Sequence, residues 1–279
     1  MKERISITLD SELIKKIDSQ IKNNDEENRS HIIESMLKKS IMSESIERAV
    51  ILAGGKGTRL RPITYEIPKA LIPIHGKTLT EHLFDLFKKY HIRNIVMAVG
   101  HMSEKIKNHF GDGSRFHIHL DYIEEKQPLG TAGPLREAKN LLKKPFIVSN
   151  GDELKDINLD EMYSMHKKYN ALATVALTTV SDPSAYGVAR LEGDKIMEFV
   201  EKPKKEDAPS NLISSGLYIF EPEVIGMIPK KGFSMIEKDV FPKLAKMGRL
   251  YGYVFSGQWF DTGNFERYEK ALKEWKGIK

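Results

Sequence analysis

The sequence predicts an α/β fold, in which a mostly parallel mixed sheet is flanked by helices and preceded by a small separate unit. From residue 49 to residue 177, apolar strand-like runs alternate with amphipathic helical patterns, which is typical of parallel sheets wrapped by helices. The apolar run Val50–Ala53 passes directly into three glycines within four positions, which favours a buried strand followed by a ligand-binding loop. Another apolar run, residues 146–148, leads into Asn150-Gly151-Asp152 and so brings a carboxylate to the edge where parallel sheets bind ligands.

The composition is that of a globular protein with a substantial core. Hydrophobic residues make up 40% and charged residues 30% of the 279 residues, so we expect one large domain or a medium domain with a small one. The absence of cysteine excludes disulfide bonds and thiolate chemistry. Residues 1–10 lack the apolar segment of a signal peptide, and no stretch is long enough to span a bilayer. We therefore expect a cytoplasmic protein without a membrane partner.

The net charge of +5 is carried by the larger part of the chain. Residues 1–47 hold eight Lys or Arg against ten Asp or Glu, which leaves +7 for the remainder. A basic domain of this kind suits phosphorylated substrates.

Residues 1–47 are predicted to form the separate unit. Arg4–Leu9 alternates polar and apolar residues, which is the period of a strand with one buried face. Asp10 or Ser11 begins a helix with apolar positions 13, 14, 17 and 21. After a polar turn, Ser30 begins a second helix with apolar positions 32, 33, 36 and 37. Because so few elements cannot bury these faces alone, we expect a homodimer or a higher oligomer formed through this unit.

This unit resembles a ribbon-helix-helix domain, the small dimeric module of many bacterial and archaeal repressors. The resemblance rests on the strand, on Asn28-Arg29-Ser30 at the start of the second helix and on the apolar spacing. In that family the paired strands enter the DNA major groove, so Arg4, Ser6 and Thr8 are the candidate DNA contacts. The negative charge of the unit instead favours a dimerisation module without DNA affinity, because phosphate neutralisation dominates DNA binding. Both alternatives stay open at this point.

Residues 48–279 form the second predicted domain. After the strand that ends at Ala53, helices are expected at Leu79–Tyr90, Ser103–Phe110, Thr131–Leu142 and Leu159–Tyr169, and strands at Ile95–Val99, His117–Tyr122, Phe146–Val148 and Ala173–Leu177. Beyond Pro183 the pattern changes to strands and hairpins, with a turn at Glu192-Gly193-Asp194. An amphipathic helix, Phe265–Trp275, comes last.

The glycine loop after Ala53 indicates a phosphate site. Glycines let backbone amides approach a ligand and form a concavity suited to anionic oxygens, and Arg59 adds a planar charged group suited to phosphate. The loop is not a P-loop, because Gly57 follows Lys56. It is not a dinucleotide fingerprint either, because Leu60 stands where the third glycine is required. Lys69 lies alone in an apolar, proline-stiffened run, and we expect it near the phosphates.

Four further short motifs follow in order. They are Tyr186-Gly187-Val188, Glu201-Lys202-Pro203, Ser215-Gly216-Leu217-Tyr218 and Trp259-Phe260-Asp261-Thr262-Gly263. Together with the earlier segments, their order and spacing make residues 48–279 resemble the sugar-1-phosphate nucleotidylyltransferases. The resemblance implies a Rossmann-like fold of the nucleotide-diphospho-sugar transferase type. It also implies an enzyme that transfers the nucleotidyl group of an NTP to a sugar 1-phosphate and releases pyrophosphate.

By resemblance, catalysis needs alignment and charge neutralisation but no protein nucleophile. Arg59, Lys69 and Asp152 would act on the reacting phosphates, and Asp152 with Asp261 would bind Mg²⁺, which prefers carboxylate and phosphate oxygens. Nucleotide contacts are expected from Leu52, Ala53, Gly54, Gly55, Gly57, Thr58, Glu125 and Gly130. Sugar-phosphate contacts are expected from Tyr186, Gly187, Glu201, Lys202 and Ser214, the last of which replaces an Asn found in many members.

The choice of base is expected to depend on Glu125. Thymidylyl- and uridylyltransferases of this family usually have Gln at this position, five residues before the glycine that matches Gly130. An ionised carboxylate only accepts hydrogen bonds, which suits the two adjacent donors of guanine better than the mixed edge of uracil or thymine. The stretch 124–134 also looks most like mannose-1-phosphate guanylyltransferases. GTP with mannose 1-phosphate is therefore the preferred pair, and dTTP or UTP with glucose 1-phosphate is the alternative.

A hypothesis of another class is a DNA-binding regulator that senses a nucleotide or sugar phosphate through a transferase-like domain. Arg59, Lys69, Asp152 and Asp261 are all present, which favours retained catalysis.

Overall fold

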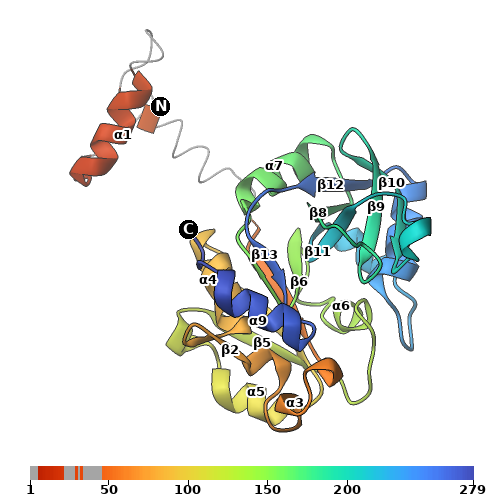
Figure 1. The fold of residues 1–279 in the computed structure, drawn as a ribbon. Helices are drawn as coiled ribbons and strands as arrows, with labels where there is room; N and C mark the ends of the chain where they lie inside the picture. Colours follow the sequence, from red (N-terminus) through yellow and green to blue (C-terminus); the bar gives the residue numbers. More distant parts are fainter. Residues whose placement is uncertain (1–5, 22–28, 31, 34–45) are drawn as a thin grey trace. The chain divides into compact units, whose positions relative to one another are not determined.

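The structure, a computed structural model, describes residues 6–21, 29–30, 32–33 and 46–279. The chain divides into two units, residues 1–45 and 46–279 (Figure 1). Among the described residues, no helix is both long enough and apolar enough to cross a membrane.

In the first unit, the first expected helix is present as α1 (Ser11–Ile21). It begins as predicted at Asp10, whose Oδ1 accepts a hydrogen bond from the Glu12 amide at 2.7 Å. Residues 29–30 and 32–33 are also helical, and both Nε and Nη2 of Arg29 donate to the Asp18 carboxylate at 2.6 Å.

The predicted strand Arg4–Leu9 is wrong for the part of it that is described. Residues 6–10 have no regular secondary structure, because a strand in a single chain has no partner for its backbone groups. Of the candidate DNA contacts, Ser6 and Thr8 are exposed in this stretch, and Arg4 lies outside the described residues. The ribbon-helix-helix assignment and the dimer stay predictions.

The second unit is built on a nine-stranded sheet, with strand order β5-β4-β1-β6-β11-β8-β12-β10-β9 among the described residues. The strands are β1 (Arg48–Ala53), β4 (Asn94–Val99), β5 (His119–Glu124), β6 (Phe146–Asn150), β8 (Ala173–Thr179), β9 (Gly187–Glu192), β10 (Lys195–Glu201), β11 (Leu212–Phe220) and β12 (Leu250–Val254). Two small sheets pair β2 (Pro73–Ile74) with β3 (Lys77–Thr78) and β7 (Glu153–Lys155) with β13 (Trp259–Asp261).

The expected parallel pairing is continuous only in the first half of the sheet. Strands β5, β4, β1 and β6 run parallel. In the second half β12 runs parallel to β8, whereas β11 is antiparallel to both β6 and β8, and β10 is antiparallel to β12 and β9. The sheet is therefore mixed, because hairpin connections replace helical crossovers after residue 180. One of these hairpins is the predicted turn: β9 and β10 are joined through Gly193, which has a φ of 58°.

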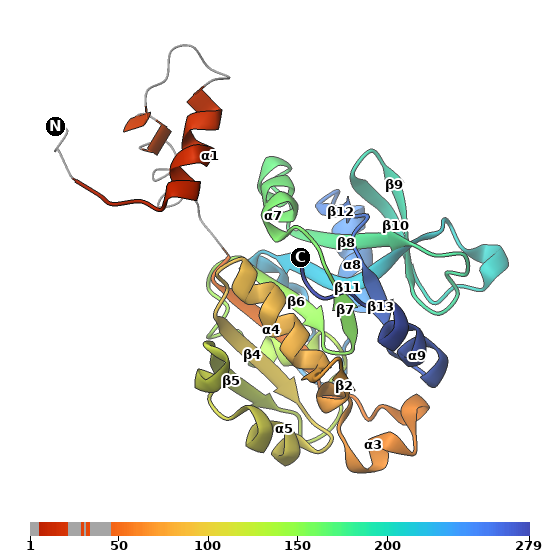
Figure 2. The same ribbon diagram turned by 60° about the vertical axis from the view of Figure 1, so that its left-hand side comes forward.

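Helices cover both faces of the sheet (Figures 1 and 2). They are α3 (Ile63–Glu66), α4 (Leu79–Lys89), α5 (Ser103–Phe110), α6 (Gly133–Glu137), α7 (Leu159–Lys168), α8 (Phe241–Lys246) and α9 (Phe265–Glu274). The period of two along β1 divides the core: Ala49 and Ile51 pack with α4, α5 and α7, while Val50 packs with α6 and α8. Figure 2 shows α4 crossing the face of the first parallel strands.

Most expected element bounds differ by one or two residues, but the helix predicted at Thr131–Leu142 is reduced to α6. It lacks the first two and the last five of the expected residues. At its start, the Ala132 amide donates to the Ser234 carbonyl at 3.0 Å and the Thr131 hydroxyl accepts from the Ile236 amide at 2.8 Å. Contacts with a distant segment have replaced local helical bonds here.

His166 on α7 is fully buried, with Nδ1 2.8 Å from the Thr174 hydroxyl. Burial, with smaller effects of Lys167 and Arg249, lowers the pKa of His166 to about 4 from an ordinary 6.5. As the pH falls below 6.5, the unfolded chain therefore takes up a proton that the folded chain does not accept.

We predict that protonation of His166 in the unfolded chain lowers the free energy of unfolding of the wild-type protein by about 2 kcal/mol between pH 7 and pH 5. The H166Q variant should not show this decrease. Urea unfolding curves at pH 7, 6 and 5 measure it. His119→Gln, at a histidine whose side chain is 63% exposed, is the matched control substitution. Identical pH dependence in wild type and H166Q would contradict the prediction.

Candidate functional site

The glycine loop leaves the carboxyl end of β1 and turns sharply into a short 3₁₀ helix at Thr58–Leu60. Gly57 has a φ of 61°, and its carbonyl accepts a hydrogen bond from the Thr64 hydroxyl at 2.7 Å. A Cβ at Gly57 would lie 2.8 Å from Cγ2 of Thr64, so only glycine fits this turn. Gly54 is equally constrained, because a Cβ there would lie 2.4 Å from Oε1 of Glu125.

The ends of β1, β4 and β6 line a pocket of about 660 Å³. This is the edge that the sequence analysis predicted, at the carboxyl ends of parallel strands. Predicted residues in the lining are Leu52, Ala53, Gly54, Gly55, Lys69, Glu125, Gly130 and Asp152. Gly57, Thr58 and Arg59 lie on the same loop but outside the lining.

An ion pair between Lys69 and Asp152 lies in this pocket. Lys69 Nζ is 2.6 Å from Asp152 Oδ2, although the two residues are 83 positions apart. The side chain of Lys69 is 11% exposed and that of Asp152 is 37% exposed. Burial alone would raise the pKa of Asp152, but the charge and hydrogen bond of Lys69 outweigh it, so the pKa lies below its usual value. Asp152 is therefore an anion at neutral pH.

Asp261 reaches the same edge through the pairing of β7 with β13. Asp261 lies opposite Glu153, and the Thr262 hydroxyl donates to the Asp152 carbonyl at 2.8 Å. The carboxylate of Asp261 accepts hydrogen bonds from Arg267 and, at 3.3 Å, from the hydroxyl of Tyr186. A Cβ at Gly263 would lie within 3 Å of both Asp261 Oδ1 and Arg59 Nη2, so this glycine leaves room for both side chains.

Asp152 and Asp261 are the residues that fit a metal. Two carboxylates from paired segments suit Mg²⁺, which takes few protein ligands and completes its shell with water and phosphate oxygens. Among the described residues, no group of three or more His, Cys, Asp or Glu is arranged to hold a metal on its own. The donor set therefore fits an ion that is bound together with a phosphorylated ligand.

Glu153 and Lys155 form a buried charged pair behind Asp152 that the sequence analysis missed. Lys155 Nζ donates to the Ser215 carbonyl at 2.7 Å and lies 3.3 Å from Glu153 Oε2. Burial raises the pKa of Glu153 to about 7, and the charges of Asp152 and Asp261 also raise it, although Lys155 opposes them. Burial lowers the pKa of Lys155. Two charged residues at alternate positions of a short strand, such as Glu153 and Lys155, are typical of an exposed strand. The sequence therefore did not indicate that this pair is buried.

Glu125, the residue expected to read the base, lines the pocket. Its Oε2 accepts a hydrogen bond from the Leu129 amide at 2.9 Å, and its Oε1 lies over Gly54. Burial raises the pKa of Glu125, and the Leu129 hydrogen bond partly offsets that effect. The neighbouring Glu124 points elsewhere, since its carboxylate accepts hydrogen bonds from Ser103 and Lys107.

Tyr186, Gly187, Glu201 and Lys202 group around the start of β9 and the end of β10. Gly187 pairs with Glu201 across the hairpin, and a Cβ at Gly187 would lie 2.9 Å from Glu201 Oε2. The Lys202 amide donates to the Tyr186 carbonyl at 2.9 Å, and Lys202 has a positive φ of 51°. This group and Asp261 lie outside the pocket lining. Tyr186 donates to Asp261, and the next residue, Thr262, donates to the carbonyl of the lining residue Asp152.

Ser214 lies in the bulge of β11 and belongs to a buried chain of hydrogen bonds. Its hydroxyl donates to the Tyr218 hydroxyl at 3.2 Å, and Tyr218 donates to Glu237 Oε1 at 3.3 Å. Thr131 donates to the other Glu237 oxygen at 2.6 Å. The chain therefore joins the Ser214 bulge to the loop that contains Gly130.

The sequence analysis also missed part of the lining. These residues are Lys56, Ala70, Gly100, His101, Lys126, Gln127, Pro128, Thr131, Asn150, Gly151, Phe233 and Met235. Gly100 and His101 follow β4, the neighbour of β1, so the sheet-edge argument could have found them. Phe233 lies in a stretch without a regular pattern and gave no signal.

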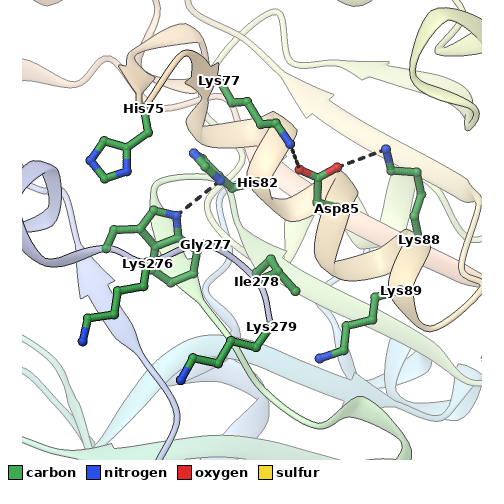
Figure 3. Close-up of a pocket in the computed structure, with 11 residues that line it drawn as sticks. His75, Lys77, His82, Asp85, Lys88, Lys89, Lys276, Gly277, Ile278 and Lys279 are labelled. Atoms are coloured by element: carbon green, nitrogen blue, oxygen red, sulfur yellow. Dashed lines mark hydrogen bonds and ion pairs between the residues drawn. The ribbon is translucent and has the colours of Figure 1, made fainter.

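A second, larger hollow of about 800 Å³ lies between α4, the β2–β3 hairpin and residues 275–279 (Figure 3). It contains none of the predicted site residues. Five lysines line it, but Asp85 pairs with both Lys77 and Lys88, and Asp156 lies 3.6 Å from Lys89. Trp275 donates to His82 Nδ1 at 3.3 Å, which attaches the last residues to α4.

Comparison with known proteins identifies the family of the chain. The chain is 40% identical over 222 residues to the mannose-1-phosphate guanylyltransferase catalytic subunit beta of Danio rerio, covering 77% of this chain and 61% of that protein. It is 37% identical over 242 residues to the UTP–glucose-1-phosphate uridylyltransferase of Synechocystis, covering 81% of this chain and 62% of that protein. The chain thus spans less than two thirds of these relatives.

A solved structure from Bacillus anthracis, assigned as a glucose-1-phosphate thymidylyltransferase, is similar with a TM-score of 0.76 and 27% identity. The similarity covers 83% of this chain and 96% of that one, and it confirms the nucleotide-diphospho-sugar transferase type of fold. The model of the nucleotidyl transferase family matches residues 48–276. The chain belongs to the nucleotidyl transferase family.

Proposed function

We propose that this protein transfers the nucleotidyl group of an NTP to a sugar 1-phosphate and releases pyrophosphate, with GTP and mannose 1-phosphate as its substrates. The observation that carries the proposal is that the glycine loop, Glu125 and the Lys69–Asp152 ion pair share one pocket. The similarity to guanylyltransferases supports the same pair of substrates.

In the proposed reaction, an oxygen of the sugar phosphate attacks the α-phosphorus of the NTP. The new P–O bond forms as the bond to the bridging oxygen breaks, and that oxygen leaves with pyrophosphate. No protein group has to form a covalent bond, so the protein contributes alignment and charge. Gly54 and Gly55 line the pocket, where their backbone amides would hold phosphate oxygens, and Arg59 on the same loop would add a positive charge.

Lys69 is the cation closest to the proposed reaction. It already holds a carboxylate oxygen at 2.6 Å, and a phosphate oxygen is an equivalent partner for the same ammonium group. Asp152 and Asp261 would hold Mg²⁺, which when bound supplies positive charge to the phosphates. Glu201 would accept hydrogen bonds from sugar hydroxyls. Lys202, whose side chain is 63% exposed and whose Nζ lies 3.4 Å from Glu201 Oε1, would hold the sugar's phosphate.

Guanine is the proposed base because Glu125 presents a carboxylate that is already oriented by the Leu129 amide. Two adjacent N–H donors of guanine can satisfy this carboxylate, whereas uracil and thymine would set a carbonyl oxygen against it. A carbonyl oxygen of the base that faces the half-buried Glu125 carboxylate would be unfavourable. Neither that carbonyl oxygen nor the carboxylate oxygen opposite it would then have a hydrogen-bond donor.

We predict that, among GTP, dTTP, UTP and CTP crossed with mannose 1-phosphate and glucose 1-phosphate, GTP with mannose 1-phosphate gives the highest kcat/KM. Coupled detection of pyrophosphate measures each pair. Turnover of dTTP or UTP with glucose 1-phosphate, without turnover of GTP, would overturn the guanylyl proposal and support the alternative.

Asp152→Asn should lower kcat by about 100-fold or more, because the amide keeps the shape but loses the charge needed for Mg²⁺ and for Lys69. Steady-state turnover at one Mg²⁺ concentration measures the loss, and added Mg²⁺ should restore part of it. Asp160→Asn, an exposed change on α7, is the control. Wild-type turnover by D152N would remove the metal role.

Glu125→Gln should lower kcat/KM for GTP by about tenfold and raise the ratio of UTP to GTP turnover, since an amide pairs with a mixed donor and acceptor edge. The control is Glu124→Gln, which changes the adjacent carboxylate outside the pocket. If both variants keep the wild-type ratio, Glu125 does not read the base.

A further inference from the structure

The aromatic ring of Phe233 is exposed beside the pocket without an assigned role. Its side chain is 63% exposed, the largest value among the exposed large hydrophobic residues of the described chain. It also lines the pocket that contains Glu125 and Gly130. A large exposed aromatic in a pocket lining is a ready contact surface for a flat ligand.

The backbone on both sides of Phe233 is fixed by hydrogen bonds, although the residue itself is exposed. The Ser234 amide donates to the Leu129 carbonyl at 2.9 Å, and the Ser234 hydroxyl donates to Asp239 at 2.7 Å. On the other side, Arg136 donates to the Pro229 carbonyl at 2.7 Å and to the Gly232 carbonyl at 3.3 Å. A ring on a held backbone can meet a ligand with little loss of conformational entropy.

This backbone is joined directly to the side chain that is proposed to read the base. Leu129 donates its amide to Glu125 Oε2 and accepts at its carbonyl from Ser234, the residue after Phe233. Gly130 permits this approach, because a Cβ there would lie 2.2 Å from the Ser234 carbonyl oxygen. Glu125 and Phe233 therefore belong to one hydrogen-bonded unit, and both line the pocket.

We propose that the ring of Phe233 stacks on the base of the bound nucleoside triphosphate while Glu125 pairs with its edge. The inference rests on the proposed function, since it takes the pocket to bind an NTP. Stacking is tolerant of base identity but grows with ring area, so Phe233 adds affinity for any base and more for a purine. Phe233 is thus a specificity-determining residue for purine over pyrimidine.

The test is nucleotide binding by calorimetry with Mg²⁺, without sugar phosphate, for wild type, Phe233→Ala and Phe233→Trp. The titrants are GTP, UTP and inorganic triphosphate. We expect F233A to weaken GTP about fivefold or more, to weaken UTP less and to leave inorganic triphosphate unchanged. F233W should keep the wild-type affinity for GTP. Because the ring is exposed, the Tm of F233A should equal that of wild type.

Met247→Ala is the matched control, because Met247 is 55% exposed and outside the pocket lining. Unchanged GTP affinity in F233A would overturn the inference. So would an equal loss of affinity for GTP and for inorganic triphosphate in F233A. A loss of GTP affinity in F233W as large as that in F233A would also overturn it. If wild type instead prefers UTP, the guanylyl proposal fails, while weaker UTP binding by F233A still supports stacking. If wild type binds no nucleotide, both proposals fail.

Discussion

The buried ammonium group of Lys155 is the constraint on which this site depends. Its side chain is fully buried and needs acceptors, which come from Ser149 on β6, Glu153 on β7 and the carbonyls of Ser215 and Gly216 on β11. Leaving such a charge without one partner costs about 3–5 kcal/mol. The three strands therefore stay in one arrangement, and Asp152, at the turn between β6 and β7, is held where Lys69 reaches it. The bulge of β11 satisfies the same ammonium, which explains why the strand departs from regular pairing near Ser214.

From this centre the site extends in two directions along connected hydrogen bonds. In one direction, Thr131 and Ser234 connect the Gly130 loop with the segment that contains Glu237. Toward the other half, β13 brings Asp261 and Tyr186 together. The two halves use different physical means. The first relies on glycines that let backbones approach closely, and the second relies on charged and aromatic side chains packed against one another, as where Arg267 lies 5.0 Å from the centre of the Tyr186 ring.

The sequence predicts local features such as strands, helices and turns. It predicts contacts between distant residues only where the family resemblance implies them. The strand before the glycine loop, the position of α5 and the turn at Gly193 follow from periodicity and from glycine. The Lys69–Asp152 pair joins positions 83 apart, and no local pattern could have paired them without the family resemblance. After residue 180 the hairpin of β9 and β10 was predicted, but the parallel pairing of β12 with β8 was not, because the same alternation serves parallel and antiparallel strands. Glu153, Lys155 and Phe233 break the rule that charges lie outside and rings inside, so residue-type rules assign them wrongly.

The pairing of β7 with β13 also bears on how the protein is made. Thr262 and Asp152, which hold the two strand ends together, are separated by 110 positions. A ribosome has therefore released the first parallel strands and the glycine loop long before Asp261 leaves the exit tunnel. Until then the nascent chain holds the glycine loop and Asp152 without Asp261. The arrangement of both aspartates at one edge of the sheet is consequently among the last parts of the protein to form, and a product truncated before β13 would lack it.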